Sequence, residues 1–407
     1  MAMGLLADRA LSADDWPQFR GPSGEGHAAL AQGSGLPLTW SESSNILWKT
    51  PVPGRGWSSP VAAGDRVWLT SGIDEGGGVS LRALAYDIET GRQVVATEIY
   101  RMARSALLNV KNSHASPTPI ISGDRVFVHF GAEGTAALTT SGEVIWRERL
   151  PYESQHGGGG SPTLYRDLLI FSGDGSDAAF VVALDAGTGK VRWKTARRQP
   201  FHQAYSTPHV IRVGERDQVL SVGAFRAAAY DPQTGKELWR VSYGDGFSNV
   251  PRPVYGHGLV FIATGFQEPS LLAVRPDGSG DVTRSHLAWT LTRAAPHTPS
   301  PLLVGDELYV VSDLGVATCL DARTGATHWR ERLGGNHSAS PVYADGRIYF
   351  QNEDGQTTVV APGRTFVKLA TSEIDGATLA SMAVARGSFF LRSHTHLYRI
   401  GSPAARR

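Results

Sequence analysis

The sequence has little of several features that mark common protein classes. Cys319 is the single cysteine among 407 residues, so no disulfide can form within the chain, and we interpret it as an inert core thiol. Lysine and arginine (39) almost balance aspartate and glutamate (38), and the net charge of +1 gives no electrostatic reason to bind nucleic acid or an anionic membrane surface. No apolar run is long enough to form a transmembrane helix. We therefore expect neither a nucleic-acid partner nor a transmembrane segment.

The first residues also lack an intact signal peptide. Residues 1–13 end in small residues that resemble a signal cleavage site, but Asp8 and Arg9 interrupt the apolar stretch that a signal peptide needs. We expect a periplasmic or otherwise extracytoplasmic protein whose leader is absent or removed.

Turn residues and tryptophan are abundant instead. The chain has 47 Gly, 23 Pro and 10 Trp, only 19% charged residues, and no convincing helical periodicity. A hairpin motif, apolar–Asp–x–x–Thr–Gly–x–x–x–Trp, occurs at Leu184–Lys194, Tyr230–Arg240 and Leu320–Leu333. Incomplete copies occur at Asp87–Gly91 and Thr139–Arg147, and a stretched copy at Arg275–Trp289. The Asp side chain can bond nearby backbone amides and the Gly supplies a positive φ, so each copy predicts a tight turn between two strands.

A second mark recurs between these hairpins, a small residue and a proline followed by a strand and a Gly-Asp turn. These anchors are Pro60, Pro119, Pro162, Pro208, Pro253, Pro301 and Pro341, with Ala383 in the eighth place. A period in the forties with short β-branched runs is typical of a radial array of four-stranded sheets. Eight anchors predict an all-β, eight-bladed β-propeller of four-stranded antiparallel blades.

The two ends of the repeat complement each other. Thr39–Pro51 reads as one outer strand with Trp48 at the motif position, whereas the blade that begins at Ala383 lacks such a strand. We therefore expect the N-terminal strand to pair with the C-terminal blade and close the ring, which removes open sheet edges.

The same reasoning divides the chain. Residues 1–38 are predicted to form an extension that packs on the propeller, residues 39–402 a single propeller domain, and residues 403–407 a tail. Trp16 and Phe19 of the extension are expected to cover one end of the ring. Five tryptophans should wedge between neighbouring blades as a docking motif: Trp146, Trp193, Trp239, Trp289 and Trp329. We expect a monomer.

The D-x-x-T-G-x-x-x-W hairpins, the eightfold count and the opening W-P-Q-F-R-G-P (Trp16–Pro22) resemble the quinoprotein-like propellers of PQQ-like repeats. That group contains the PQQ-dependent alcohol dehydrogenases and the outer-membrane assembly lipoprotein BamB. The resemblance covers about residues 39–401 and implies the fold more than a function, because the repeated residues build blades. The dehydrogenases typically carry a disulfide of adjacent cysteines against the cofactor, which one cysteine cannot form, and this argues against PQQ as the cofactor. BamB is anchored through a lipidated N-terminal cysteine, and no cysteine lies near this N-terminus.

Candidate functional residues lie in the leading loops, the loops that lead into the first strand of each blade and share one rim of the ring. Candidate ligand-binding residues are Arg55, Trp57, Lys111, Asn112, His156, Tyr205, Asn249, Arg252, Arg293 and Asn336. Candidate catalytic residues are His114, His202, His297 and His337. Arginine suits carboxylates or phosphates, Trp and Tyr suit the apolar face of a sugar ring, and imidazole serves as acid, base or metal ligand. Taken singly, each of these histidines also fits a solvated or hydrogen-bonded loop residue.

Two further patterns have simpler interpretations. His394–His396 is a His-x-His pair compatible with a divalent metal, but no third ligand is nearby in the sequence, and a plain strand end fits it as well. Gly173–Asp177 resembles part of a calcium loop, yet no Glu completes the pattern, so we interpret it as a turn.

Three functions remain open. In the first, the His/Arg/Trp-rich channel mouth binds a small polar or anionic ligand, with a saccharide as the leading candidate, and acts on it by acid–base or metal-assisted chemistry or not at all. In the second, the protein is a non-catalytic, BamB-like scaffold for a protein partner. In the third, it is a PQQ-dependent alcohol or sugar dehydrogenase without the adjacent-cysteine disulfide.

Overall fold

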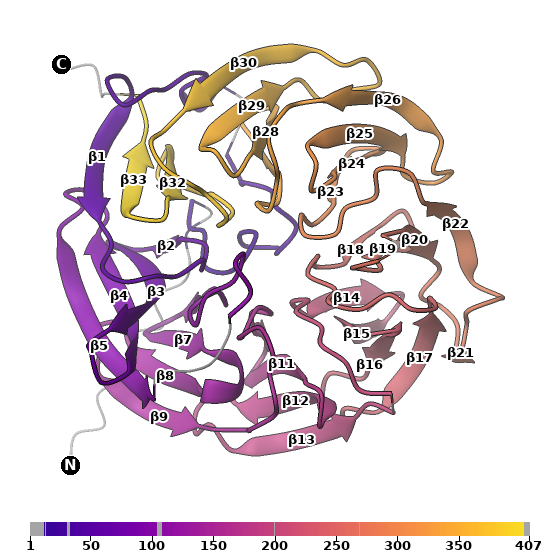
Figure 1. Ribbon diagram of the computed structural model, residues 1–407. Helices are drawn as coiled ribbons and strands as arrows, with labels where there is room; N and C mark the ends of the chain where they lie inside the picture. Colours follow the sequence, from indigo (N-terminus) through magenta and orange to yellow (C-terminus); the bar gives the residue numbers. More distant parts are fainter. Residues whose placement is uncertain are drawn as a thin grey trace.

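The strands form eight sheets arranged around a central axis. The computed structural model describes residues 12, 14–30, 33–103, 108–198, 200–267 and 269–402. Within these ranges every sheet is one blade of a ring (Figure 1), which confirms the predicted eight-bladed all-β propeller. The predicted tail, residues 403–407, lies outside the described residues, as do residues 1–11 and 13.

Blades 1 to 4 follow the chain in order. Blade 1 contains β2 (Val61–Ala63), β3 (Arg66–Asp74), β4 (Val79–Asp87) and β5 (Gln93–Met102); blade 2 contains β6 (Ile120–Ser122), β7 (Arg125–His129), β8 (Thr135–Thr139) and β9 (Val144–Glu148), with the 3-10 turn η1 (Gly131–Glu133) between β7 and β8. Blade 3 contains β10 (Thr163–Tyr165), β11 (Leu168–Asp174), β12 (Ala179–Asp185) and β13 (Val191–Ala196), and blade 4 contains β14 (His209–Val213), β15 (Arg216–Val222), β16 (Arg226–Tyr230) and β17 (Glu237–Ser242).

Blades 5 to 8 complete the ring. Blade 5 contains β18 (Val254–Gly256), β19 (Leu259–Ala263), β20 (Leu271–Val274) and β22 (Leu287–Leu291); blade 6 contains β23 (Leu302–Val304), β24 (Glu307–Val311), β25 (Val316–Asp321) and β26 (Thr327–Arg332). Blade 7 contains β27 (Val342–Ala344), β28 (Arg347–Gln351), β29 (Gln356–Val360) and β30 (Lys368–Glu373), and blade 8 contains β31 (Ala383–Ala385), β32 (Ser388–Arg392), β33 (His396–Ile400) and β1 (Ile46–Pro51).

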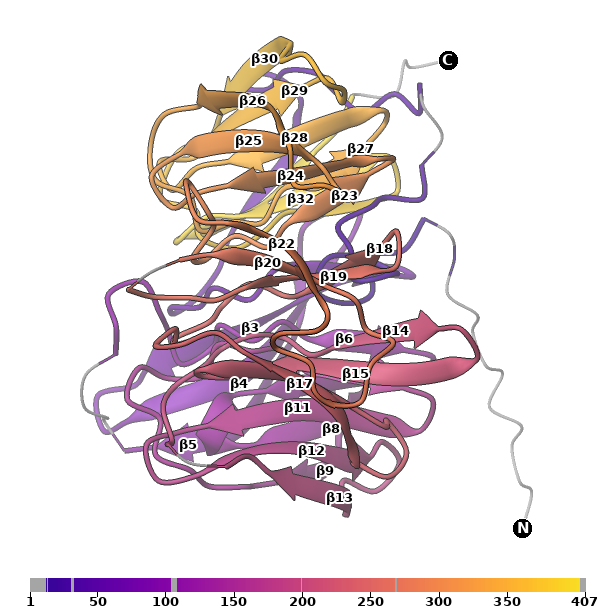
Figure 2. The same cartoon turned by 90° about the vertical axis from the view of Figure 1, so that its right-hand side faces the viewer.

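The position of a strand in its blade decides its burial. The middle strands β11 and β12 are buried along most of their length, because both of their faces lie against neighbouring blades. The outer strand β13 is exposed at most positions and buries Trp193. Figure 2 shows the blades from the side, with outer strands such as β13 and β30 at the periphery. The core therefore consists of separate apolar layers between adjacent blades.

The ring closes where its two ends meet. β1 pairs antiparallel with β33, with Lys49 opposite Tyr398 and Pro51 opposite His396. Figure 1 shows β1 beside β33 at the edge of blade 8. The predicted pairing of the N-terminal strand with the C-terminal blade is thus confirmed.

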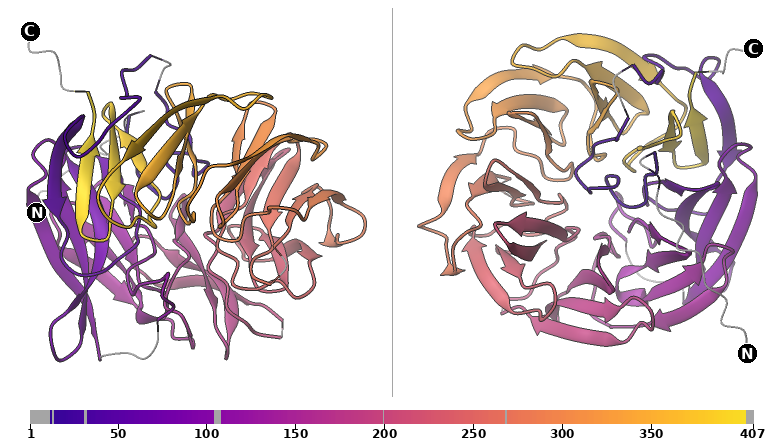
Figure 3. Two further views of the ribbon diagram at one scale, coloured as in Figure 1. Left: turned by 45° about the horizontal axis from the view of Figure 1, so that its top comes forward. Right: turned by 180° about the vertical axis from the view of Figure 1, so that it is seen from behind.

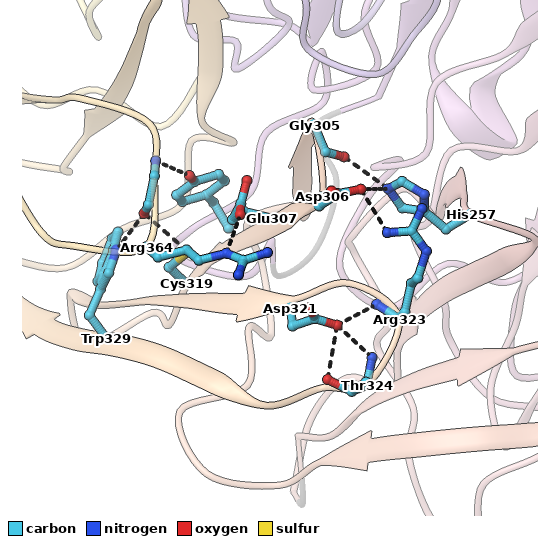
Figure 4. Close-up of polar contacts among 12 residues, drawn as sticks. His257, Gly305, Asp306, Glu307, Cys319, Asp321, Arg323, Thr324, Trp329 and Arg364 are labelled. Atoms are coloured by element: carbon cyan, nitrogen blue, oxygen red, sulfur yellow. Dashed lines mark hydrogen bonds and ion pairs between the residues drawn. The ribbon is translucent and has the colours of Figure 1, made fainter.

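Tryptophans on the outer strands connect each blade to the next. Trp329 of blade 6, labelled in Figure 4, donates its Nε1–H to the Gly363 carbonyl of blade 7 at 3.0 Å. In the same view the Asp321 carboxylate accepts the Thr324 amide and hydroxyl, both at 2.9 Å, which fixes the hairpin turn. Four more indoles make the equivalent bond at 3.0–3.1 Å: Trp48 to Ile88, Trp146 to Ala186, Trp193 to Pro232 and Trp289 to Ala322.

The hairpin glycine is needed for this docking as well as for the turn. Gly189 has a φ of +75°, and a Cβ there would lie 2.6 Å from the ring of Trp146. Any other residue would strain the turn and displace the indole.

Trp239 is the exception. Its Nε1–H donates to Gln218 Oε1 at 2.8 Å, and Gln218 Nε2 donates to the Pro276 carbonyl of blade 5 at 3.2 Å, so a glutamine relays the contact. The hairpin of blade 5 is the longer one and contributes a short strand, β21 (Gly280–Asp281), that pairs parallel with β17. Blade 4 therefore has five strands, and the prediction of four antiparallel strands in every blade was wrong for this blade.

Residues 14–30, here called the N-terminal strap, cross one end of the ring. Trp16 pairs with Ala62 of blade 1 through two backbone hydrogen bonds, and Ala28 donates to the Tyr343 carbonyl of blade 7 at 2.9 Å. The Arg20 guanidinium donates to the Pro301 carbonyl of blade 6 at 2.6 Å. Figure 3 (right) shows this indigo segment running across the centre of the ring.

In the described part of the chain, no helix has the length and apolar character to cross a membrane.

Candidate ligand-binding cavity

A cavity of about 630 Å³ lies inside the ring, a volume typical of small-molecule sites. Phe19 of the N-terminal strap lines it, as do residues of the leading loops on the opposite rim. The strap thus forms part of the wall, and the cavity lies between it and the predicted channel mouth.

A circle of hydroxyl groups surrounds the cavity. The residue before the anchor of seven blades lines it with a hydroxyl: Ser59, Thr118, Ser161, Thr207, Ser300, Ser340 and Ser381. Six of these hydroxyls accept the backbone N–H of the equivalent residue in the preceding blade at 2.8–3.0 Å. Since a hydroxyl that accepts one bond can still donate its own proton, the circle offers donors to a polar ligand. In the sequence, these hydroxyl residues are the small residues that precede the anchor prolines.

The hydroxyl positions also show which residue of blade 8 is equivalent to the anchor prolines. Ser381 occupies the hydroxyl position of blade 8, so Met382 takes the place of the proline, and the assignment of Ala383 was wrong by one residue. In blade 5 the hydroxyl position is held by Arg252, which is 1% exposed. Its guanidinium donates to the Phe19 carbonyl at 3.0 Å, so this side chain holds the strap and does not line the cavity.

Polar contacts join several of the lining residues. Lys111 Nζ pairs with Glu353 Oε1 at 2.8 Å, and the same oxygen accepts the Ser338 hydroxyl at 2.5 Å. His156 Nδ1 lies 2.9 Å from the Tyr205 hydroxyl. Burial raises the pKa of Tyr205, which keeps this phenol protonated at neutral pH.

Two phenylalanine rings also line the cavity. Phe247 and Phe266 have ring centroids 5.6 Å apart and planes inclined at 69°. His202 lies 4.1 Å from Phe247, and His297 lies 5.6 Å from Phe266, measured between ring centroids. Phe266 is 50% exposed although it is large and apolar. The sequence did not single out these phenylalanines, because a lone Phe in a loop has no distinguishing pattern.

Asp313 is the carboxylate that lines the cavity beside these rings. Its Oδ2 accepts the backbone N–H groups of His297 at 2.8 Å and Thr298 at 3.1 Å. Its Oδ1 lies 3.8 Å from His297 Nδ1, which is too long for a hydrogen bond. Burial lowers the pKa of His297 despite the nearby carboxylate, so this imidazole is neutral at pH 7.

The structure brings six of the predicted site residues together at the cavity. They are Trp57, Lys111, Asn112, His156, Tyr205 and His297. The other eight do not line it: Arg55, His114, His202, Asn249, Arg252, Arg293, Asn336 and His337. One of the four candidate catalytic histidines, His297, is therefore a lining residue.

Local contacts account for several of these positions. The Arg55 guanidinium donates to the Val110 carbonyl at 2.8 Å and lies 5.9 Å from the Trp57 ring centroid. Asn249 is fully buried and donates to the Tyr243 hydroxyl at 3.2 Å. The side chains of Arg55 and Asn249 therefore make hydrogen bonds within the protein and do not line the cavity.

The remaining predicted residues differ in burial. His337 is 1% exposed, and burial lowers its pKa to about 4. Burial and the Arg55 guanidinium lower the pKa of His114. Arg293 and Asn336 are exposed to solvent. Both histidines are thus held neutral near pH 7 and lie away from the cavity wall.

The described residues contain no group of three His, Cys, Asp or Glu side chains placed to hold a metal ion. His394 faces the Trp57 ring at 6.1 Å, and His396 Nδ1 lies 2.8 Å from the Thr395 hydroxyl. Cys319 is buried, and burial raises its pKa to about 12, as expected of an unreactive core thiol.

The cavity is also a poor fit for PQQ. This quinone carries three carboxylates, and such an anion needs several cationic partners. Among the described lining residues, Lys111 is the only lysine or arginine, and Glu353 already neutralises it. The residues present therefore do not match that cofactor.

Comparisons with known proteins agree with the architecture. The family model described as outer membrane protein assembly factor BamB matches residues 9–159, 136–225 and 223–365. The crystal structure of BamB from Moraxella catarrhalis is similar with a TM-score of 0.63 at 14% identity, covering 89% of this chain and 98% of that one. A europium-containing methanol dehydrogenase is similar with a TM-score of 0.64 at 10% identity, covering 95% of this chain and 91% of that one. Such low identities show a shared fold alone.

One curated relative is a serine/threonine-protein kinase, AfsK of Streptomyces griseus. It is 28% identical over 178 residues, which is 41% of this chain. The match spans 22% of the kinase, so the similarity concerns only a part of that protein. The family model, in contrast, matches most of the chain. This chain belongs to the PQQ-like repeat β-propeller family, the family described as outer membrane protein assembly factor BamB.

Proposed function

We propose that the protein binds a small polar ligand in the cavity, with saccharides as the leading class. The observation that carries this proposal is that the hydroxyl circle and the rings of Phe247 and Phe266 line the same cavity. A sugar has hydroxyl groups that donate and accept hydrogen bonds, and an apolar face that stacks on aromatic rings. It therefore complements both the hydroxyl circle and the phenylalanine rings.

The charge of the cavity supports a ligand that is not strongly anionic. Arg55, Arg252 and Arg293 favoured an anion in the sequence, but none of them lines the cavity. Lys111 is paired with Glu353. The proposed function is binding, because the candidate acid–base histidines do not gather at one point of the cavity.

Calorimetric titration with glucose, galactose and glucuronate tests the proposal. We expect at least one neutral sugar to bind, and Phe247→Ala or Phe266→Ala to weaken it by about twofold to tenfold, since an aromatic contact contributes about 0.5–1.5 kcal/mol beyond its buried area. Phe366→Ala is the matched control, because Phe366 packs on Trp329 at the outer edge of the ring, away from the cavity. The proposal fails if none of the three sugars binds, or if the control variant loses as much affinity as the other two.

A protein-interaction role is the second candidate, favoured by exposed apolar side chains on the same rim. Val110 is 83% exposed, Leu314 is 68% exposed and Phe266 is 50% exposed. These residues come from blades 2, 6 and 5 and lie in loops that share the rim of the mouth. We expect Leu314→Ser to weaken capture of a protein partner in a cross-linking experiment in the native host, without a change in sugar binding. Equal capture by both forms would argue against this role.

We also propose an extracytoplasmic location, from the small-residue N-terminus that resembles a signal cleavage site. Fractionation of cells that express the full-length gene product tests it. Recovery of the protein with cytoplasmic markers would contradict the proposal.

A further inference from the structure

The charges inside the cavity are not balanced. Among the described lining residues, Lys111 is the only lysine or arginine, and Asp313 is the only aspartate or glutamate. Lys111 Nζ lies 2.8 Å from Glu353 Oε1, so its charge is already offset by a carboxylate. Asp313 has no such cationic partner among the described residues, where its one ion-pair contact is to His297 at 3.8 Å.

His297 does not neutralise Asp313. Burial favours the uncharged imidazole and lowers its pKa, so at neutral pH it carries no positive charge. The two hydrogen bonds to Asp313 come from uncharged backbone N–H groups, which orient the carboxylate and leave its charge in place. The side chain of Asp313 is 21% exposed, so a ligand in the cavity can reach it. The carboxylate is therefore a negative charge in the cavity wall with no ion pair to a lysine or arginine among the described residues.

His297 lies between this charge and two aromatic rings of the cavity. The backbone of His297 bonds to Asp313, and its ring lies 5.6 Å from that of Phe266, which in turn lies 5.6 Å from Phe247. The 69° angle between the two phenylalanine planes is that of an edge-to-face contact, and both rings line the cavity. The face of an aromatic ring attracts a cation, and a carboxylate near such faces adds a direct ionic attraction.

We infer that the ligand carries a protonated amino group, held between Asp313 and the rings of Phe247 and Phe266. This inference rests on the proposed saccharide function and narrows it to amino sugars. The rest of such a ligand would face the hydroxyl circle, which offers hydrogen-bond donors to its oxygen atoms.

Glucosamine, N-acetylglucosamine and glucose are the probes, titrated at pH 6.5 into the whole protein. An amine is protonated at this pH, whereas the acetylated amine is neutral and glucose has none. We expect glucosamine to bind at least tenfold more tightly than the other two sugars. We also expect 0.5 M NaCl to weaken glucosamine and to leave glucose unchanged, because salt screens only the ionic contact.

Asp313→Asn removes the charge and keeps an oxygen that can accept the backbone N–H groups. It should abolish the preference, so that glucosamine and glucose then bind with affinities equal to within about twofold. Asp354→Asn is the matched control, since Asp354 is an exposed carboxylate on the neighbouring loop and does not line the cavity. It should retain the preference.

The outcomes separate the two proposals. Equal affinity of the wild type for glucosamine and glucose would overturn the inference and leave the saccharide proposal intact. Failure of these three sugars and of galactose and glucuronate to bind would overturn both. If Asp313→Asn does not fold, the comparison of sugars and the salt dependence of the wild type still decide the question.

Discussion

Replacement of Trp239 by alanine should produce one of the largest stability losses available in this chain. Trp239 has 0% exposure and lies in the apolar layer between blades 4 and 5. Its indole N–H donates to Gln218 Oε1, and Gln218 passes the contact to the Pro276 carbonyl. The substitution therefore empties a buried volume and breaks the polar link between the two blades.

The magnitude follows from burial. A tryptophan buries about 200 Å², and at roughly 25 cal/mol per Å² its transfer from water contributes about 5 kcal/mol before entropy is subtracted. Measured Trp→Ala changes in cores cost about 3–5 kcal/mol, and we expect this range for Trp239→Ala. Trp239→Phe keeps most of the apolar area but leaves Gln218 Oε1 without its donor, which should cost about 1–3 kcal/mol.

Denaturant unfolding followed by circular dichroism gives the change in the free energy of unfolding. Trp289→Ala is the matched comparison, because Trp289 docks on the next blade through its indole N–H but is only partly buried. We expect it to cost at least about 1 kcal/mol less than Trp239→Ala. Sugar affinity should be unchanged in both variants, since neither indole lines the cavity. Equal losses of stability, or lost binding in a folded Trp239→Ala protein, would refute this purely structural role.

Three other predictions concern buried ionisable side chains. Arg252→Met should release the strap, because the guanidinium bond to the Phe19 carbonyl is lost, and limited proteolysis should then cut residues 14–30 faster than in the wild type. Burial lowers the pKa of His337 from 6.5 to about 4, so the unfolded chain takes up this proton first as the pH falls. Stability should therefore be complete above about pH 6.5 and decline towards pH 4, and His337→Gln should show a shallower decline in pH-dependent unfolding. Arg197→Met should cost about 3–5 kcal/mol because it strands the buried Asp174 carboxylate, whereas the double replacement with Asp174→Asn should cost less; the two side chains are 5% and 2% exposed, and a double-mutant cycle that finds simple additivity would contradict this.

Repetition made the fold readable from the sequence. The Asp-Thr-Gly hairpins and the proline anchors are local signals, since each depends on residues within one turn, and they recur often enough to number the blades. The strand that contains Trp48 has no blade of its own in the repeat, and the last blade lacks one strand, so the repeat also predicted ring closure. Docking of the tryptophans followed from their place on an outer strand, where a large apolar side chain must find a neighbouring surface.

The site was harder to predict, because the leading loops have no regular period that sets the direction of a side chain. Arg252 lies in the expected loop, but it turns to a strap residue 233 positions earlier in the chain. Phe247 and Phe266 gain significance only because folding places their rings side by side. The unpaired charge of Asp313 likewise depends on which distant groups do and do not approach it. The sequence by itself determined the repeat, its count and its closure, whereas tertiary contacts between distant segments decided which loop residues face the cavity.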